Sequence, residues 1–241
     1  LADLEAGVAA LGLPCVLKTR RLGYDGRGQR VLKKRSDVGP AWEALGSVPL
    51  ILEGFVKFDR EVSIVGARST RGETRCYPIV TNTHREGILR VTVAPTRDAR
   101  LQRAAEGHLR RVLDHFGYAG VLTIEFFVAG GRLIANEMAP RVHNSGHWTI
   151  EGAVTSQFEN HLRAILGLPL GETGAVGHAA MVNFIGAMPD PARVLALPGV
   201  HHHDYGKAPR PGRKLGHATV VARSVAERDR VLRKLLRLVP R

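Results

Sequence analysis

Cysteine, aromatic side chains and long apolar runs are all scarce in this chain of 241 residues. Its two cysteines, Cys15 and Cys76, each lie in an apolar stretch without C-x-x-C spacing, which favours two buried free thiols over a disulfide or a metal site. No stretch approaches the roughly 20 consecutive apolar residues of a membrane span, and no basic stub precedes an apolar block as in a signal peptide. We therefore expect a cytoplasmic protein without a membrane partner.

Acidic residues are outnumbered, because 35 Lys and Arg face 22 Asp and Glu, and the formal charge is +13. Such a charge suits either nucleic acid or small polyanionic substrates. Aromatic residues make up 5% of the chain and do not interleave with the basic runs, which argues against a stacking platform for single strands. The basic residues are also spread along the whole chain. We expect small anionic substrates and no nucleic-acid partner.

Apolar residues, at 44%, are sufficient for a buried core. Hydrophobic periodicity, caps and turn residues predict alternating helices and strands. The predicted helices are residues 3–11, 36–45, 98–116, 157–166 and 224–238. The predicted strands are residues 15–19, 50–54, 61–66, 76–80, 88–94, 121–128, 132–137, 177–185 and 217–222, with irregular segments at 139–152 and 189–212.

A glycine-rich loop follows the first predicted strand, and it matches neither the P-loop nor the dinucleotide fingerprint. Its glycines allow the backbone N–H groups to approach an anion, and Arg27 adds a fork of donors suited to phosphate. Lys18 lies in the preceding strand, where its ammonium could reach nucleotide phosphates. The alternatives are a hairpin turn and an edge-strand lysine facing water. The loop is Gly23, Tyr24, Asp25, Gly26, Arg27, Gly28 and Gln29.

Two further strand ends carry groups that suit a nucleotide. The segment Glu53, Gly54, Phe55, Val56 leaves one predicted strand, and Glu61 begins the next. A strand exit offers backbone groups to an adenine edge, and a carboxylate accepts hydrogen bonds from ribose hydroxyls. Taken singly, each carboxylate is equally explained as an ordinary strand end.

The pair Glu125 and Glu137 is a sharper signal, because each carboxylate interrupts an apolar strand and needs a partner there. A three-residue loop, Ala129 to Gly131, would place Glu125 opposite Ala135, so that the two carboxylates share a face as diagonal neighbours about 7 to 8 Å apart. A two-residue loop would put them on opposite faces. On one face they could hold Mg²⁺ with ATP phosphates, and the alternative is two solvent-facing carboxylates.

Several segments together resemble 5-(carboxyamino)imidazole ribonucleotide synthase, the ATPase subunit of phosphoribosylaminoimidazole carboxylase, in the ATP-grasp superfamily. The lysine strand and the Asn-Glu hairpin strand are shared by ATP-grasp ligases generally, whereas the glycine loop and the Ala-Pro-Arg-Val-His-Asn-Ser-Gly-His string are more specific. The segments are Leu17 to Thr19, Gly23 to Gln29, Glu61 to Ser63, Asn136 to His147 and Arg210 to His217.

The resemblance implies an α+β ATP-grasp fold in which two mixed or antiparallel sheet subdomains clamp ATP, with a small β-rich C-terminal piece. We expect an ATP-grasp domain over residues 1–188 and a subdomain completing the substrate site over 189–241. Family members also carry an N-terminal Rossmann-like domain, which this sequence does not contain. Because the chain begins at Leu1 inside an amphipathic helical pattern, we expect a preceding segment, and the activity of the chain alone is left open.

The implied reaction is carboxylation of 5-aminoimidazole ribonucleotide in purine biosynthesis. ATP phosphorylates bicarbonate to carboxyphosphate, whose carboxyl group passes to the exocyclic amine, so the enzyme is an ATP-dependent ligase that uses Mg²⁺. We also expect a homodimer. The alternatives are another ATP-grasp ligase or carboxylase of purine metabolism, or a non-catalytic nucleotide-binding or nucleic-acid-binding remnant.

The resemblance also assigns roles to residues. Glu53 to Val56, Glu61, His84, Asn136 and Glu137 would hold the nucleotide, while Arg27, Lys207 and Arg213 would hold the phosphate of the ribonucleotide beside Tyr24. His143 and Asn144 would lie by bicarbonate, and His143 is the candidate for proton transfer, with a structural hydrogen-bonding role as the alternative. The run His201 to His203 is expected to be structural, because consecutive strand residues alternate faces and cannot ligate one ion.

Overall fold

The structure, a computed structural model, describes residues 1–21, 23, 28–46 and 48–240. It divides into two compact units, which we describe separately. The first comprises Leu1–Lys57 with Arg85–Ile88, and the second comprises Phe58–His84 with Leu89–Arg241. The predicted domain boundary between residues 188 and 189 is a division by function and stays a prediction.

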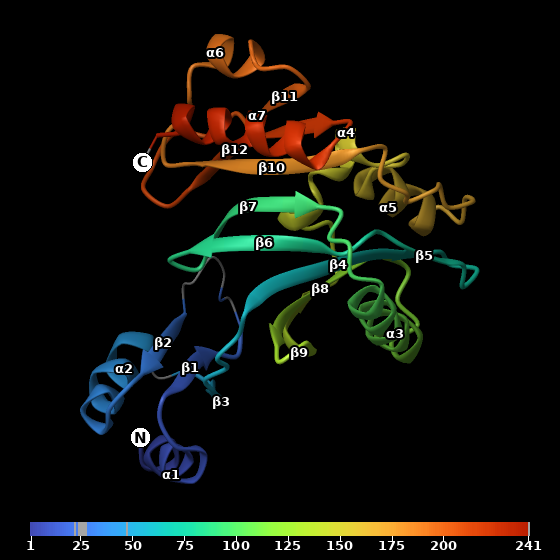
Figure 1. Cartoon of the computed structure of the whole chain (residues 1–241). Coiled ribbons are helices and arrows are strands. Elements are labelled where there is room, and N and C mark those ends of the chain that lie inside the picture. The colour runs from blue at the N-terminus through green and yellow to red at the C-terminus, as the bar shows by residue number, and fades with distance from the viewer. Residues whose placement is uncertain (22, 24–27, 47, 241) are drawn as a thin grey trace. The chain divides into compact units, whose positions relative to one another are not determined.

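The first unit is built on a small antiparallel sheet in the order β2-β1-β3 (Figure 1). Alternate residues of β1, Cys15 and Leu17, are fully buried and pack with Leu4 and Val8 of α1. This is the period-two burial expected of a strand with one face on a core. The elements are α1 (Ala2–Leu11), β1 (Cys15–Thr19), β2 (Gln29–Leu32), η1 (Arg35–Asp37), α2 (Val38–Leu45) and β3 (Leu50–Gly54).

The second unit is built on a nine-stranded sheet in the order β11-β12-β10-β7-β6-β4-β8-β9, with β5 paired to β4. Its strands are β4 (Arg60–Arg68), β5 (Thr74–Cys76), β6 (Val80–Arg85), β7 (Ile88–Ala94), β8 (Gly120–Ala129), β9 (Arg132–Ala139), β10 (His178–Ile185), β11 (Val200–Asp204) and β12 (Lys214–Ala222). Its helices are α3 (Ala99–His115), η2 (Asn144–Gly146), α4 (Thr149–Gly152), α5 (Gln157–Ile165), α6 (Pro191–Leu195) and α7 (Val225–Leu238).

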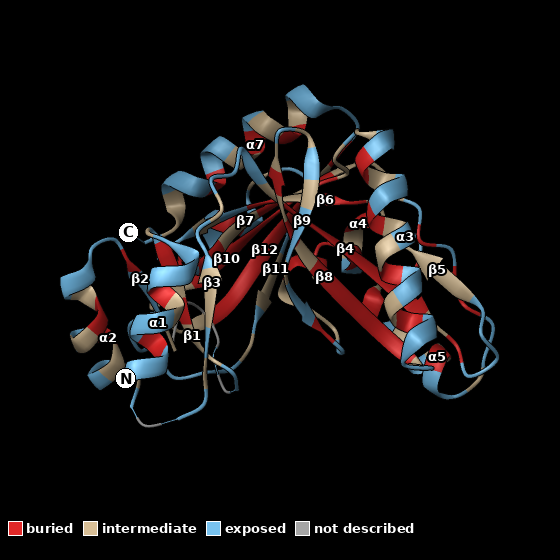
Figure 2. Ribbon diagram, turned by 90° about the horizontal axis from the view of Figure 1, so that it is seen from below, coloured by how far each residue is buried: buried red, intermediate tan, exposed pale blue. Residues whose placement is uncertain are grey.

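Helix α3 covers one face of this sheet. Its start is fixed by Asp98, whose carboxylate accepts a hydrogen bond from the Leu101 N–H at 3.0 Å, as an N-cap residue does. Figure 2 shows the buried residues of α3 in red beside the largely buried strands β4 and β8. The core there joins one stripe of the helix, spaced by three or four residues, to alternate residues of the strands. It contains Leu101, Ala105, Leu109, Leu113, Val62, Ile64, Leu122, Ile124 and Phe126.

The opposite face of the sheet buries a second core, which includes Val65, Ala67, Val121 and the fully buried Trp148. These strand residues alternate with those that face α3, so β4 and β8 are apolar on both faces. The odd-numbered positions of β8 continue from Val121 to Thr123 and Glu125. The apolar face therefore turns polar along the strand, and this change marks the candidate site.

Most predicted helices and strands are confirmed, but the segments expected to be irregular contain η2 and α4 within 139–152, and α6 and β11 within 189–212. The strand predicted at residues 76–80 is wrong. The structure has β5 ending at Cys76 and β6 beginning at Val80. Pro78 lies between them and has no backbone N–H to donate to a sheet ladder. Tyr77 is buried there and its hydroxyl donates to the Thr155 carbonyl at 3.0 Å, so the segment anchors the strands to the helical layer.

The predicted three-residue loop between β8 and β9 is also wrong. Ala129 pairs directly with Arg132, so the loop is the two residues Gly130 and Gly131, which have φ values of 53° and 71°. A tight two-residue hairpin turn requires positive φ at both of its central residues, and glycine adopts such φ values without steric cost. An unbroken ladder from this turn would place Glu125 and Glu137 on opposite faces.

A β-bulge restores the shared face. Phe126 pairs with Ala135, whereas Glu125 pairs with Glu137, so Asn136 is an extra residue in β9. A bulge sets two residues against one and shifts all later side chains by one position. The two carboxylates are therefore direct cross-strand partners rather than the predicted diagonal neighbours.

Cross-linking distinguishes the bulged register from the unbroken one. In a background with Cys15 and Cys76 replaced by alanine, Glu125→Cys with Glu137→Cys should form a disulfide on mild oxidation, because direct partners have Cβ atoms about 5 Å apart. Ile124→Cys with Glu137→Cys is the matched control, since these residues would be partners only without the bulge. Mass spectrometry and thiol titration measure both, and cross-linking of the control pair alone would contradict the bulge.

Candidate active site

A row of polar side chains crosses one face of the second unit's sheet. The register pairs Glu137 with Glu125, Glu125 with Ser63, and Glu61 with Asn82. Because residues two apart in a strand share a face, His84 belongs to the same row. The sheet thus gathers three carboxylates and a histidine predicted from the sequence.

The carboxylate of Glu125 is the most strongly perturbed member of the row. Its side chain is 12% exposed. The pKa of Glu125 is raised to about 7, mainly by burial and also by the nearby carboxylates of Glu137 and Glu61, against the opposing effects of His84 and Lys214. A buried carboxylate among other carboxylates suits a cation partner.

Glu61 and His84 form a pair in the same row. His84 Nδ1 lies 2.9 Å from Glu61 Oε2, and both side chains are about one fifth exposed. Burial by itself lowers the pKa of His84, but the hydrogen bond and charge of Glu61, with the charge of Glu125, outweigh it and raise that pKa overall. The structure therefore brings together two of the residues predicted to hold the nucleotide.

The loop that carries His143 and Asn144 is fixed by a buried glutamine. Gln157 accepts from the His143 N–H at 3.0 Å and donates to the His143 carbonyl at 2.7 Å and to His147 Nδ1 at 2.9 Å. Gly146 allows this approach, since a Cβ there would lie 2.4 Å from Gln157 Oε1. These hydrogen bonds hold the loop in a fixed position.

His143 itself is held neutral. Its pKa is lowered to about 3, mainly by burial and also by the cationic groups Arg141 and Lys214. Its Nδ1 lies 2.9 Å from Ser145 Oγ and 3.9 Å from Glu125 Oε1. The longer contact exceeds hydrogen-bond range, so His143 and Glu125 are neighbours rather than an ion pair.

Asn144 is bound by its side chain to the neighbouring strand. It exchanges two hydrogen bonds with Asn183 of β10, at 3.0 and 2.7 Å. Asn183 also donates to the Leu89 carbonyl at 3.0 Å. The predicted place beside bicarbonate stays a prediction, and the observed contacts give Asn144 a structural part in tying the loop to β10.

Lys207 and Arg213 both lie in the segment that joins β11 to β12. Lys207 Nζ is 5.0 Å from the centre of the Tyr205 ring, within the range of a cation–π contact. Arg213 donates through Nη1 to the Ala208 carbonyl at 3.2 Å. Two cations predicted to bind one phosphate are thus placed on one short loop.

The histidines of β11 divide between two faces, as predicted. His203 stacks on His217 with ring centres 4.3 Å apart, and its Nε2 lies 2.5 Å from Glu151 Oε1. His202 instead lies against Phe184. Among the described residues, no group of three or more His, Cys, Asp or Glu side chains is arranged to hold a metal ion.

In the first unit, Lys18 and Glu53 form an ion pair. Lys18 Nζ lies 2.7 Å from Glu53 Oε2, with side chains 23% and 40% exposed. The alternative of an edge-strand lysine is wrong, because β1 is the middle strand of its sheet. At such exposure the pair contributes little to stability.

The rest of the glycine loop is only partly described. Tyr24, Asp25, Gly26 and Arg27 lie outside the described residues. Gly28 has φ of 74° and its carbonyl accepts from the Thr19 N–H at 2.8 Å. The remaining predicted nucleotide contacts of this unit are placed without an observed ligand role: Gly23 is exposed, Gln29 starts β2, Gly54 ends β3, and Phe55 and Val56 follow it.

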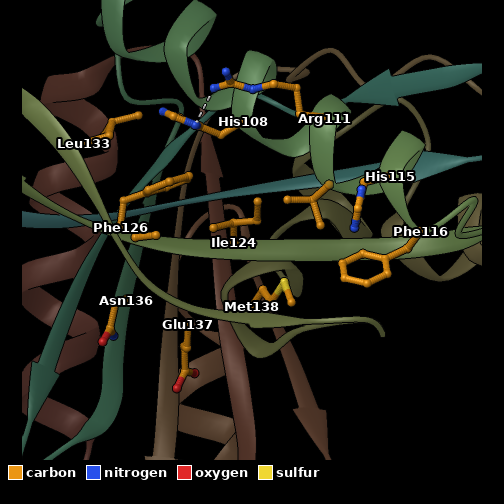
Figure 3. A pocket seen from close by; sticks show the side chains of 12 residues that line it. His108, Arg111, His115, Phe116, Ile124, Phe126, Leu133, Asn136, Glu137 and Met138 are labelled. Atoms are coloured by element: carbon orange, nitrogen blue, oxygen red, sulfur yellow. Dashed lines mark hydrogen bonds between the residues drawn. The ribbon is translucent and has the colours of Figure 1, made fainter. Parts of the chain in front are cut away.

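A cavity of about 610 Å³ lies between α3 and the β8–β9 hairpin (Figure 3). Its lining is mainly apolar and includes Ile124, Phe126 and Leu133. In Figure 3 the side chains of Asn136 and Glu137 point the same way, away from these apolar groups, as a bulge requires of two successive residues. The cavity therefore opens mainly on the α3 face, and Glu137 belongs both to its lining and to the polar row.

Several residues of the site escaped the sequence analysis. Lys214 and Arg141 act electrostatically on His143. In the sequence Lys214 follows Arg213, and Arg141 lies two residues before His143. Ser63, Ser145 and Gln157 are fully buried and hydrogen-bonded within the site. A buried polar residue cannot be recognised from a single sequence, because the same residue types are common on protein surfaces.

Two family models together match most of the chain. The family model of the ATP-grasp domain matches residues 1–158. The model of the phosphoribosylaminoimidazole carboxylase C-terminal domain matches residues 179–231. The chain belongs to the ATP-grasp family, and the predicted fold class is confirmed.

Individual relatives agree with the predicted resemblance. The N5-carboxyaminoimidazole ribonucleotide synthase of Pseudomonas aeruginosa is 61% identical over 219 residues, covering 91% of this chain and 61% of the relative. The enzyme of that name from Vibrio cholerae is 48% identical over 240 residues, covering 97% of this chain and 63% of the relative. The chain thus spans about three fifths of the length of these relatives.

Solved structures agree equally well. The N5-carboxyaminoimidazole ribonucleotide synthetase of Thermus thermophilus has a TM-score of 0.93 at 52% identity, over 100% of this chain and 66% of that one. The Aspergillus clavatus enzyme, solved with ADP and 5-aminoimidazole ribonucleotide, has a TM-score of 0.91 at 32% identity, over 98% and 65%. The resemblance indicated by the motifs is confirmed.

The raised pKa of Glu125 predicts a pH-dependent stability. Its folded value near 7 exceeds the unfolded value near 4.3, so the ionised carboxylate destabilises the folded chain above pH 7, and the penalty disappears below about pH 4. As the pH is raised from 4 to 8, the free energy of unfolding of Glu125→Gln should therefore increase relative to that of the parent by on the order of 3 kcal/mol.

Urea unfolding in EDTA measures this difference. A Trp42→Phe background leaves the buried Trp148 as the reporter of the second unit. The exposed Glu172, whose side chain is 68% exposed, supplies the control Glu172→Gln, for which the difference should stay nearly flat. A flat difference for Glu125→Gln as well would contradict the assigned burial.

Proposed function

We propose that the protein is an ATP-dependent ligase that carboxylates 5-aminoimidazole ribonucleotide to N5-carboxyaminoimidazole ribonucleotide. Bicarbonate attacks the γ-phosphorus of ATP, giving carboxyphosphate and ADP. The carboxyl group then passes to the exocyclic amine, with release of phosphate and the amine proton. The observation that carries the proposal is the opposed pair Glu125 and Glu137 inside a sheet, in a chain whose relatives bear the corresponding name.

The carboxylate pair fits Mg²⁺. Mg²⁺ is commonly held by one or two carboxylates, with phosphates and water completing its shell, and the cross-strand pair supplies that number. The raised pKa of Glu125 is the state expected of a ligand whose cation is removed, since binding would release its proton. When bound, the metal neutralises charge on the transferring phosphoryl group.

The other nucleotide contacts follow from charge and position. In the first unit, Lys18 would exchange its carboxylate partner Glu53 for phosphate oxygens, and the N–H groups of the glycine loop would face the same anion. In the second unit, Glu61 would accept from ribose hydroxyls while His84 orients its carboxylate. Asn136, beside Glu137 at the bulge, would donate to a phosphate.

The ribonucleotide phosphate suits the basic loop between β11 and β12. Lys207 and Arg213 lie there, and Arg27 is proposed as a third donor. Cations of this kind bind a phosphate dianion through charge-assisted hydrogen bonds. Mg²⁺ as the metal, a homodimer, a cytoplasmic location and the absence of a nucleic-acid partner remain part of the proposal. Within the described residues, no helix is both long enough and apolar enough to cross a membrane.

ADP formation tests the reaction. The chain alone, and the chain fused to the additional segment by which the Pseudomonas relative is longer, are assayed with Mg²⁺ and bicarbonate, with and without 5-aminoimidazole ribonucleotide. We expect the ribonucleotide to stimulate ADP formation in at least one form. Saturable ATP binding without stimulated turnover in either form would contradict the ligase and favour a non-catalytic nucleotide-binding protein.

Glu137→Gln tests the metal site within the same assay. The change keeps the shape and removes the charge, so turnover should fall by about 10² to 10³ while circular dichroism stays unchanged. Glu172→Gln, on an exposed side chain of the same unit, is the matched control and should retain parent activity. Full turnover in Glu137→Gln would rule out the carboxylate pair as the metal ligand.

A further inference from the structure

A line of buried polar groups ends at His143. Thr92 Oγ1 donates to Asn82 Oδ1 at 2.9 Å, and Asn82 Nδ2 donates to Ser63 Oγ at 2.9 Å. Ser63 Oγ donates to Ser145 Oγ at 2.8 Å, which lies 2.9 Å from His143 Nδ1. The four residues that lead to His143 are at most 5% exposed. Because water hardly reaches these groups, they hydrogen-bond to one another rather than to solvent.

The proton of His143 is located by its neighbours. The backbone N–H of Ser145 lies 3.3 Å from His143 Nδ1, and an amide N–H can only donate. Because Nδ1 therefore accepts, the Ser145 hydroxyl, 2.9 Å away, must be the donor in its contact with the same Nδ1, and it accepts from Ser63 in turn. Nδ1 must present a lone pair to both donors, which leaves the proton on Nε2 of a neutral ring.

A competing arrangement is present in the same site. Glu125 Oε1 lies 3.9 Å from His143 Nδ1, and a small shift would make a hydrogen bond if Nδ1 carried the proton. In that state His143 would pair with a proposed metal ligand, and its Nε2 would be an acceptor. The polar line therefore determines whether Nε2 of His143 is a hydrogen-bond donor or a hydrogen-bond acceptor.

We propose that Ser145, Ser63 and Asn82 are positioning residues that hold His143 as the neutral Nε2–H tautomer. His143 then acts as a hydrogen-bond donor to an anionic oxygen of bicarbonate or of the phosphoryl group, rather than as a proton acceptor. The cations Arg141 and Lys214 act on the same ring, as suits an anionic ligand. The identity of that ligand rests on the proposed function, whereas the tautomer does not.

Nuclear magnetic resonance reads the tautomer directly. Long-range ¹H–¹⁵N correlation spectra of the ¹⁵N-histidine-labelled chain are recorded at neutral pH without metal or nucleotide. The signals of His143 are those lost in His143→Gln. We expect an unprotonated Nδ1 and a protonated Nε2. A protonated Nδ1, in either a neutral or a cationic ring, would overturn the proposal whatever the activity of the protein.

Asn82→Asp tests the direction of the line. A carboxylate of the same shape can only accept, so Ser63 would turn to donate to it and the Ser145 hydroxyl would turn toward Ser63. The Nδ1–H form should then increase, and kcat should fall about tenfold with little change in KM for ATP. Glu172→Gln, on an exposed side chain outside the line, is the control and should keep the tautomer.

If Asn82→Asp does not fold, Ser145→Ala takes its place. It removes the shorter of the two contacts to Nδ1, at 2.9 Å against 3.3 Å for the backbone N–H, so the Nδ1–H form should increase. An unchanged tautomer in both Asn82→Asp and Ser145→Ala would show that these residues do not set it.

Two amide substitutions test the use of Nε2–H. The amide nitrogen of glutamine takes the place of Nε2, and that of asparagine takes the place of Nδ1. In whichever form of the protein turns over, His143→Gln should retain kcat within about tenfold and His143→Asn should lose about 10² to 10³. Equal losses would contradict the donor role. Absence of turnover in the parent, with the Nε2–H tautomer observed, would count against the proposed reaction and not against the tautomer.

Discussion

The opposition of Glu125 and Glu137 across β8 and β9 is the constraint on which the rest of the site depends. Like charges directly opposed in a sheet repel each other, and burial adds the cost of desolvating Glu125. The fold nevertheless creates the pair through one extra residue, Asn136. The arrangement is unfavourable without a cation and requires a specific irregularity of the sheet, and both features support the proposed cation site.

The surroundings of the pair are organised by buried hydrogen bonds rather than by further charges. Gln157 fixes the backbone on both sides of His143, and Asn183 fixes the side chain of Asn144. Satisfied polar networks in a protein interior are rigid, because breaking any link leaves a buried group unpaired. The loop is therefore held in place before any ligand arrives, which lowers the entropic cost of binding and reaction.

How much of this could be predicted from sequence depended on whether a feature has a periodic or a local signature. Helix α3 was predicted to within a residue at each end, because Asp98 caps it and its apolar residues follow helical spacing. Strands β1, β3 and β7 were predicted with their observed bounds. These elements are specified by patterns that a few neighbouring residues carry.

Features that depend on pairing between distant residues were not predictable in this way. The shared face of Glu125 and Glu137 was anticipated, but from a wrong loop length, because a bulge at Asn136 leaves no mark on the composition of β9. The polar line through Ser63, Asn82 and Ser145 was missed altogether, since its members are separated by 19 and 82 residues. The proposed metal ligands were recognised from the sequence because carboxylates in apolar strands need a partner, whereas their cross-strand pairing could be seen only in the sheet register.

The most direct test of this account is electron paramagnetic resonance of Mn²⁺ titrated into the chain, with and without a non-hydrolysable ATP analogue. Bound Mn²⁺ loses its sharp aqueous signal, so free and bound ion are counted in one spectrum. The account predicts saturable Mn²⁺ binding in the presence of the analogue that is lost in the Glu125→Gln, Glu137→Gln double variant. Equal Mn²⁺ binding by the double variant and the parent would contradict it.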